Sequence, residues 1–205
     1  MKRLFALMFA LLTMLPQAGA ASEAPDAMIR RLSNEVLDRI RADKDIQAGD
    51  LKKLSDMVDA VVMPNVNFQR MTALAVGRNW RAATPEQQKQ LMTEFRALLL
   101  RTYSGAVSSV KDQTVRMKPM RADPADTDVV VRSELVQPRG EPIQLDYRLE
   151  KANDGWKIYD VNVLGVWLVE TYRNQFAQEV SAKGIDGLIK SLSDKNKSFD
   201  PARKS

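Results

Sequence analysis

The feature that most constrains the fold is a change in the spacing of apolar residues near position 112. Up to that point apolar side chains recur every three or four residues, as on one face of a helix. From about 113 to 163 they alternate with polar side chains, as in a strand with one buried face. The helical spacing returns after 164–165. This order of helices, antiparallel strands and helices predicts an α+β fold.

The first helical region predicts helices over 28–40, 51–62 and 68–75, followed by one long helix of about six turns. The clearest helix start belongs to the long helix. There Thr84 can act as the N-cap, Pro85 suits the first helical position, and Gln87 completes a capping box.

The alternating region predicts a meander of about four strands. Three of them are expected over 128–137, 143–150 and 156–163, with a more irregular one over 113–120. Asn153-Asp154-Gly155 is typical of a hairpin turn. One face of this sheet carries polar side chains and is expected to face water, so helices must cover the other. The final helical region is expected to be interrupted at 184–187 (GIDG).

Residues 1–20 are typical of a cleaved export signal. Lys2 and Arg3 precede an apolar run over 4–15, and residues 18–20 (AGA) form a small-x-small cleavage site. The run is shorter than the roughly 17–25 residues that a membrane-spanning helix needs. We therefore expect cleavage after Ala20 and export to a bacterial periplasm.

The remaining composition excludes several kinds of chemistry. The chain contains no histidine and no cysteine, so thiol catalysis, disulfides and a Ser-His-Asp triad are impossible. No metal, cofactor or enzymatic activity is expected. Loss of Lys2 and Arg3 with the signal reduces the formal net charge from +5 to +3, which does not favour nucleic acid as a partner. We expect a monomer with one domain over 21–195 and a polar, basic tail over 196–205.

Four segments carry a family resemblance: 76–87 (VGRNWRAATPEQ) leading to Phe95 and 101–103 (RTY), 159–169 (YDVNVLGVWLV), 172–176 (YRNQF) and 183–189 (KGIDGLI). In this order, behind an export signal, they resemble the MlaC-type proteins. These are the soluble periplasmic components of the maintenance-of-lipid-asymmetry system, also called toluene-tolerance auxiliary components of ABC transporters. The resemblance covers nearly all of 24–192. The family usually has a small Ser where Trp167 stands, so Trp167 could narrow or re-line a cavity.

The resemblance implies an NTF2-like fold, in which helices on the concave side of a curved antiparallel sheet enclose a lipid pocket. It also implies a carrier of phospholipid between an outer-membrane lipoprotein complex and an inner-membrane ABC transporter with an MCE-domain protein. Such a carrier needs no catalysis and no cofactor.

On this interpretation the pocket lining comes from the apolar sheet face and the helix stripes opposite it. The lining candidates are Leu74, Val76, Leu99, Tyr103, Val107, Val131, Leu145, Tyr147, Leu149, Val161, Val163, Val166 and Trp167. Arg78, Arg81 and Arg101 are candidate contacts of the lipid phosphate. The alternatives are that the apolar residues form an ordinary packed core and that the arginines are solvated surface charges.

Two other functions remain open. NTF2-like folds also host isomerases and dehydratases, which here would use Asp146, Tyr147, Tyr159 and Asp160. Strand alternation places Asp146 on the water-facing side, opposite Tyr147, where its carboxylate is not desolvated. The other alternative is a periplasmic adaptor or chaperone without a ligand cavity, which predicts a filled core and an external apolar patch.

Overall fold

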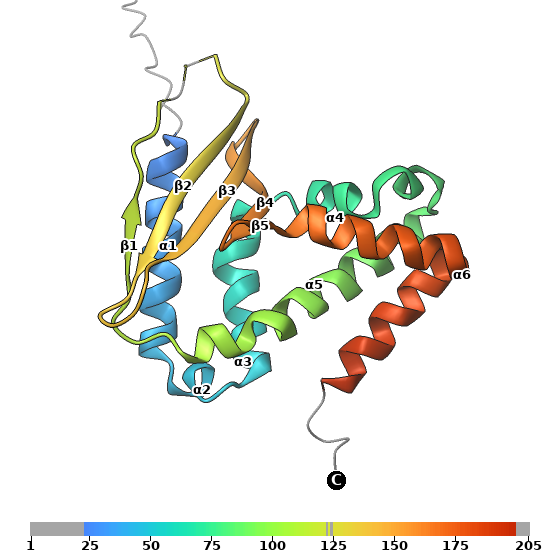
Figure 1. The fold of residues 1–205 in the computed structure, drawn as a ribbon, viewed down its shortest axis with the longest axis horizontal. Coiled ribbons are helices and arrows are strands. Elements are labelled where there is room, and N and C mark those ends of the chain that lie inside the picture. The colour runs from blue at the N-terminus through green and yellow to red at the C-terminus, as the bar shows by residue number, and fades with distance from the viewer. Residues whose placement is uncertain (1–22, 122, 124, 200–205) are drawn as a thin grey trace, which may run out of the picture.

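One antiparallel sheet carries helices on one face and is joined to a second group of helices beyond its end (Figure 1). The computed structural model describes residues 23–121, 123 and 125–199. The expected export signal over 1–20 lies outside the described residues. Within them, no helix is both long and apolar enough to cross a membrane.

The sheet confirms the α+β class and the meander. Its strands pair in chain order: β1 (Thr114–Met117), β2 (Asp128–Val136), β3 (Ile143–Ala152), β4 (Gly155–Val163) and β5 (Val166–Trp167). Four of these strands lie where the alternation predicts them. The fifth strand was not predicted, because a strand of two residues is too short to show alternation.

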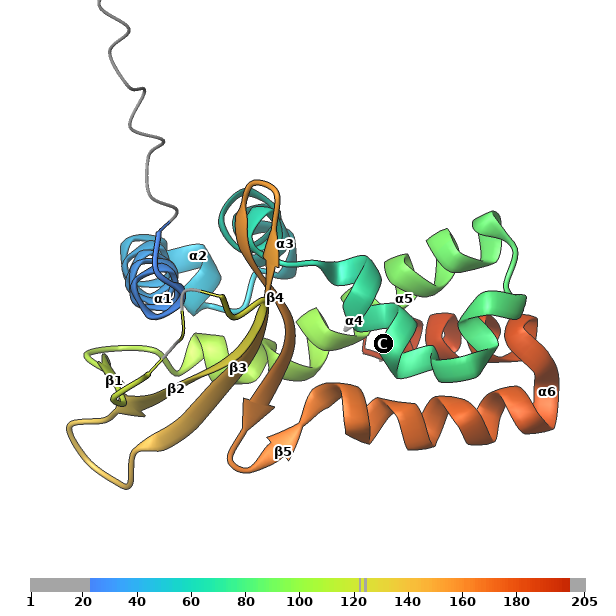
Figure 2. The ribbon, with the colours of Figure 1, turned by 90° about the horizontal axis from the view of Figure 1, so that it is seen from above.

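The helices also follow the predicted order. They are α1 (Pro25–Ala42), α2 (Lys44–Gln47), α3 (Leu51–Met57), α4 (Phe68–Val76), α5 (Pro85–Ser108) and α6 (Leu168–Ser198). Three tighter or wider turns connect them: the π-helical η1 (Val58–Val62) and the 3-10 turns η2 (Met63–Asn65) and η3 (Gly77–Ala82). Seen from above, α1 and α3 lie on one side of the sheet, and α6 runs away from β5 (Figure 2).

Local chemistry sets both the start of α5 and the break inside α6. The capping box of α5 is present: the Gln87 backbone N–H donates to the Thr84 hydroxyl at 3.2 Å, and the Thr84 N–H donates to the Gln87 side chain at 2.9 Å. Gly184 interrupts α6 with a φ of 71°, a conformation that favours glycine. The second half of α6 then packs beside α5 through Leu188 and Leu192.

The end of α6 passes the expected domain boundary at 195. The Asn196 side chain is buried and donates to the Glu94 backbone carbonyl at 2.9 Å and to its carboxylate at 2.7 Å. The first residues of the expected tail over 196–205 are therefore helical and held against α5. Residues 200–205 lie outside the described part of the chain.

The polar face of the sheet differs from the expectation. Asp146 and Asp160 are only 5% and 0% exposed, so the expectation that Asp146 faces water is wrong. The Asp160 carboxylate accepts hydrogen bonds from the Val161 and Val169 backbone N–H groups and pairs with Arg148 at 2.9 Å. The Trp167 ring covers the Arg148 guanidinium at 3.9 Å from the ring centroid. Neighbouring side chains and β5 shield this face, which strand alternation alone does not show.

Apolar side chains form two cores. The core of the sheet half joins α1, α3 and η1 to β2, β3 and β4. The core of the helical half joins α4 and the two parts of α6 to Leu91, Phe95 and Leu98 of α5. The two halves are named below by these elements, and α5 runs through both.

Candidate functional site

The sheet half contains a cavity of about 660 Å³. This volume falls in the range of about 300–1,000 Å³ that is common for sites of small molecules. The cavity lies between the sheet and the helices α1, α3 and α5, and its walls are almost entirely apolar side chains. The sequence pattern alone left open whether these stripes pack together, and here they do not.

The sheet forms one wall through alternate residues of neighbouring strands. Leu145 and Tyr147 on β3 lie beside Val161 and Val163 on β4, because Leu145 pairs with Val163 and Tyr147 with Val161. This register places four side chains of the same sheet face next to one another. The sheet wall is therefore continuous across the two strands.

Helices α1 and α3 and the turns after α3 form the facing walls. On α1 the lining residues recur at helical spacing: Ile29, Leu32, Ser33, Val36, Leu37 and Ile40. After Leu54 of α3, the π-helical turn η1 contributes Val58 and Val62, and Met63 follows directly. The α- and π-helical stretch ends at Val62, in agreement with the helix predicted over 51–62, and a 3-10 turn that contains Pro64 follows.

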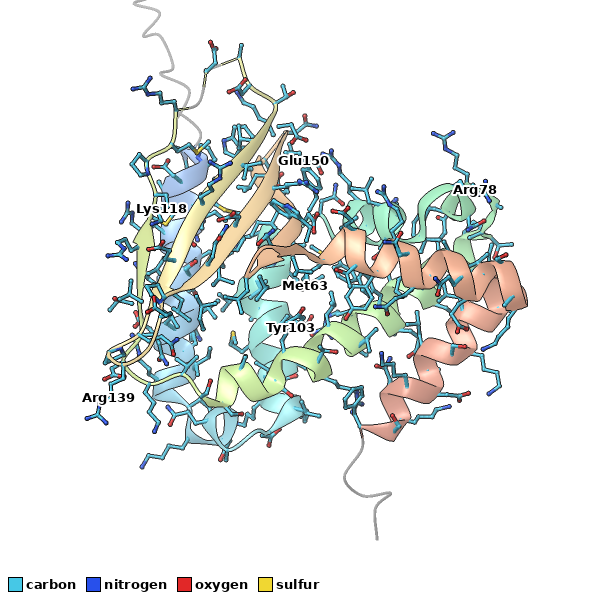
Figure 3. All side chains as sticks on the ribbon, viewed as in Figure 1. Met63, Arg78, Tyr103, Lys118, Arg139 and Glu150 are labelled. Carbon is cyan, nitrogen blue, oxygen red and sulfur yellow. The ribbon has the colours of Figure 1, made fainter. Side chains whose placement is uncertain are left out.

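Helix α5 supplies the wall between these surfaces. Its lining residues are Arg96, Leu99, Leu100, Tyr103, Ala106 and Val107. Figure 3 shows Tyr103 on α5 and Met63 in the region between the sheet half and α5, and both line the same cavity.

The few polar groups in the wall are largely partnered. Arg96 is the one charged side chain in the lining formed by the described residues, and its Nη2 donates to Asp59 at 2.6 Å and to the Ser55 hydroxyl at 3.1 Å. Burial raises the pKa of the Tyr147 phenol, while hydrogen bonds with Ser33 and Ser133 act in the opposite direction. The interior can thus surround apolar chains without leaving an unpaired charge.

The predicted lining residues divide into two groups. Seven lie on the cavity wall: Leu99, Tyr103, Val107, Leu145, Tyr147, Val161 and Val163. The other six lie elsewhere, as a result of packing that periodicity does not reveal.

Those six residues have identifiable positions. Leu74 and Val76 of α4 pack in the core of the helical half, and Val131 and Leu149 are fully buried in the core of the sheet half. The remaining two are on β5: Val166 is 54% exposed, and Trp167 lies over Arg148. Trp167 therefore neither narrows nor re-lines the cavity.

The predicted phosphate contacts also lie off the cavity. Arg78 and Arg81 are exposed in η3, and Figure 3 shows Arg78 pointing outward at the far end of the helical half. Arg101 is on α5 but is absent from the cavity wall.

The part of the cavity wall that the sequence analysis did not predict is formed by α1 and η1. Their apolar stripes were visible in the sequence, but a stripe has the same pattern whether it meets a core or a void.

Of the four residues that an enzyme would use, only Tyr147 lines the cavity. Asp146 and Asp160 belong to the opposite sheet face, as their neighbours Leu145 and Val161 line the cavity. Tyr159 lies at a bulge in β4, where its hydroxyl donates to Asp128 at 2.7 Å. Burial raises the pKa of Asp160 despite its hydrogen bonds to the Val169 and Val161 N–H groups and its pairing with Arg148. These groups tie segments of the fold together.

An apolar cavity between a sheet and helices is typical of proteins that hold an apolar or amphipathic ligand. A family model described as "MlaC protein" matches residues 30–194. The chain belongs to the MlaC family, which confirms the resemblance seen in the sequence.

Individual relatives cover most of the chain. The toluene tolerance protein ttg2D of Pseudomonas putida is 24% identical over 177 residues, which cover 86% of this chain and 82% of that protein. The intermembrane phospholipid transport system binding protein MlaC of Haemophilus influenzae is 22% identical over 194 residues, which cover 92% of this chain and 91% of that protein. A phospholipid-binding protein from Ralstonia solanacearum, solved in complex with a phospholipid, is 46% identical with a TM-score of 0.84, and the match covers 86% of this chain and 99% of that chain.

Proposed function

We propose that this protein carries phospholipid between membranes and holds the acyl chains in the cavity of the sheet half. The observation that carries the proposal is the continuous apolar wall formed by β3, β4, α1, η1 and α5. The phospholipid complex of the Ralstonia solanacearum protein, which shares this fold, supports the same ligand class.

The energetics of transfer explain why such a wall is needed. Each methylene exposed to water costs about 0.8 kcal/mol, so about thirty methylenes of a two-chain lipid cost on the order of 20 kcal/mol. A carrier that surrounds the chains with apolar side chains offers them an environment similar to the bilayer. Transfer between membrane and cavity is then nearly balanced, and it requires no covalent step.

The family and the sequence support a periplasmic setting for this carrier. Export through residues 1–20 would place the mature protein in the periplasm as a monomeric carrier. Its partners would be an outer-membrane lipoprotein complex and an inner-membrane ABC transporter with an MCE-domain protein. The name of the Haemophilus influenzae relative, an intermembrane phospholipid transport system binding protein, supports this setting.

Native mass spectrometry of the purified mature protein tests the proposal directly. We expect a complex whose extra mass matches phospholipid, with the same lipid recovered by extraction. A protein that stays at its apo mass after purification and after incubation with phospholipid vesicles would overturn the proposed function.

A pair of tryptophan variants tests where the acyl chains lie. Leu145→Trp places a larger side chain in the cavity wall, so bound phospholipid should fall at least severalfold. Val130→Trp is the control, because Val130 is on the neighbouring strand but 40% exposed and outside the lining. Equal lipid content in both folded variants would show that the chains lie elsewhere.

A further inference from the structure

A second, smaller cleft of about 330 Å³ lies beside the main cavity. It is formed by α5, the β4–β5 turn and both halves of α6, and we call it the polar annex. Tyr103, Val163 and Leu168 line the polar annex and also the main cavity. These three side chains therefore form the boundary between the two spaces.

The two spaces differ in the chemistry of their walls. The main cavity is almost wholly apolar. The wall of the polar annex is mixed, since Thr102, Thr171, Gln175 and Lys195 stand beside apolar residues such as Val166 and Phe199. An apolar chamber that adjoins one with several polar groups in its wall matches the two ends of an amphipathic molecule. This juxtaposition is a property of the fold, because the break at Gly184 turns the second half of α6 back along α5, so that residues of both halves of α6 line the cleft.

Lys195 is the group best placed to attract an anion. Among the described residues its ammonium forms no ion pair, and the acidic residue beside it, Asp194, pairs instead with Lys190 at 2.6 Å. Gln175 lies opposite on the first half of α6, is exposed, and has no hydrogen bond from its side chain to a described residue. Both groups are therefore available as donors.

Arg96, the cation in the wall of the main cavity, is less suitable than Lys195 as a partner for an anion. The Nη2 of Arg96 is already held by Asp59 and Ser55, so the charge of its guanidinium is compensated, although its buried Nε has no partner among the described residues. Arg78 and Arg81, the phosphate contacts expected from the sequence, lie in η3 and line neither space. Among the described residues, Lys195 remains as a cation beside the apolar cavity that forms no ion pair.

We propose that the polar annex receives the phosphate of the lipid head group while the acyl chains occupy the main cavity, with Lys195 and Gln175 as phosphate donors. The proposal rests on the proposed function. Lysine binds phosphate as a compact charge, and a charge-assisted hydrogen bond is stronger than a neutral one. The carrier would then favour lipids whose head group carries net negative charge.

A charge reversal tests this preference. Delipidated protein is incubated with vesicles of equal phosphatidylglycerol and phosphatidylcholine, and the bound lipids are quantified by mass spectrometry. Lys195→Glu should reduce the bound ratio of phosphatidylglycerol to phosphatidylcholine about tenfold. Lys197→Glu is the control, because it makes the same charge change two residues away and outside the polar annex. Equal ratios in the two variants would overturn the proposal.

A steric variant tests occupancy without changing charge. Gln175→Trp fills the polar annex from an exposed helical position and should lower bound phosphatidylglycerol severalfold, whereas Gln178→Trp, also exposed on α6, should not. Circular dichroism checks that both variants are folded. The same lipid content in both would contradict a head group in the polar annex.

Two further outcomes separate the possible failures. If wild-type protein binds inorganic phosphate in calorimetry, Lys195→Glu abolishes that binding, and both proteins retain the same lipids, then the polar annex is a site for free anion and the head-group assignment is wrong. If wild-type protein takes up no phospholipid at all, the proposed function fails together with this inference. Normal lipid uptake without any effect of Lys195→Glu overturns only the inference.

Discussion

The two halves of this molecule contain the same kind of apolar helix stripe, but these stripes form a filled core in one half and border a cavity in the other. In the helical half the stripes close into a solid core, where the Phe95 ring lies 4.9 Å from Tyr172 and 5.2 Å from Phe176, measured between centroids. In the sheet half similar stripes on α1 and α5 stand apart across a cavity of about 660 Å³. The difference lies in the partner surfaces and not in the apolar content.

Helix α5 makes the comparison within one element. Its first part places Leu91, Phe95 and Leu98 in the filled core at 0–1% exposure. Its later part places Leu100 and Tyr103 on the cavity wall. A continuous amphipathic helix can thus complete a core at one end and bound a ligand space at the other.

The largest predicted effect compares two leucines of α5. Leu98→Ala removes a side chain from the filled core and should lower the free energy of unfolding by about 2–5 kcal/mol, because a new void is left. Leu100→Ala removes the same atoms beside an existing void, so only the loss of partial burial, about 1 kcal/mol, is expected. Urea unfolding of the delipidated variants measures both values. Equal losses would show that α5 is packed alike along its length.

Much of this fold can be predicted from sequence, since its signals are local. The capping box at Thr84, the break at Gly184 and the alternation over 143–150 each depend on neighbours in the chain, and each lies where it was expected. The family resemblance added the curved sheet and the ligand class.

The cavity wall is harder to predict, because it depends on which stripes fail to meet. Val131 and Leu145 lie on the same sheet face, yet one is buried at 0% exposure and the other borders the cavity. Strand alternation cannot separate them, since it gives the face and not the distance to the helix opposite. The burial of Asp146 has the same origin, as cover by neighbouring side chains is a tertiary effect.

A polar cluster joins the two halves. Arg70 of α4 pairs with Glu150 and with Asp128 of the sheet, and its guanidinium lies 3.7 Å from the centroid of the Tyr159 ring. The Tyr159 hydroxyl donates to Asp128 at 2.7 Å. This cluster holds α4 against the sheet on which the cavity depends.

The second prediction concerns pH and this cluster. Burial, and then the hydrogen bond to Asp128, raise the pKa of Tyr159 to about 12. Between pH 10 and 12 the folded state keeps the phenol proton while the unfolded chain releases it. The contribution of Tyr159 to the free energy of unfolding is therefore complete below pH 10 and is lost as pH rises to 12. The loss should be about 2 kcal/mol. Tyr159→Phe cannot titrate, so its unfolding free energy should fall less steeply over this range. Parallel curves for the two proteins would contradict this assignment.

The smallest predicted effect places one methyl group in each half. Gly184 has a φ of 71°, and its conformation closes α6 back onto the filled core, so Gly184→Ala should cost about 1 kcal/mol or slightly more. Gly105 lies inside α5 in the sheet half, without positive φ and with no atom within 4 Å of an added Cβ, so Gly105→Ala should stabilise the protein by about 0.5–1 kcal/mol. Thermal unfolding of the two variants should therefore shift in opposite directions. If the unfolding temperature fell for both variants, the part of α5 that borders the cavity would be under a constraint that its helical geometry does not show. The difference between the filled and the open half would then not be explained by their partner surfaces alone.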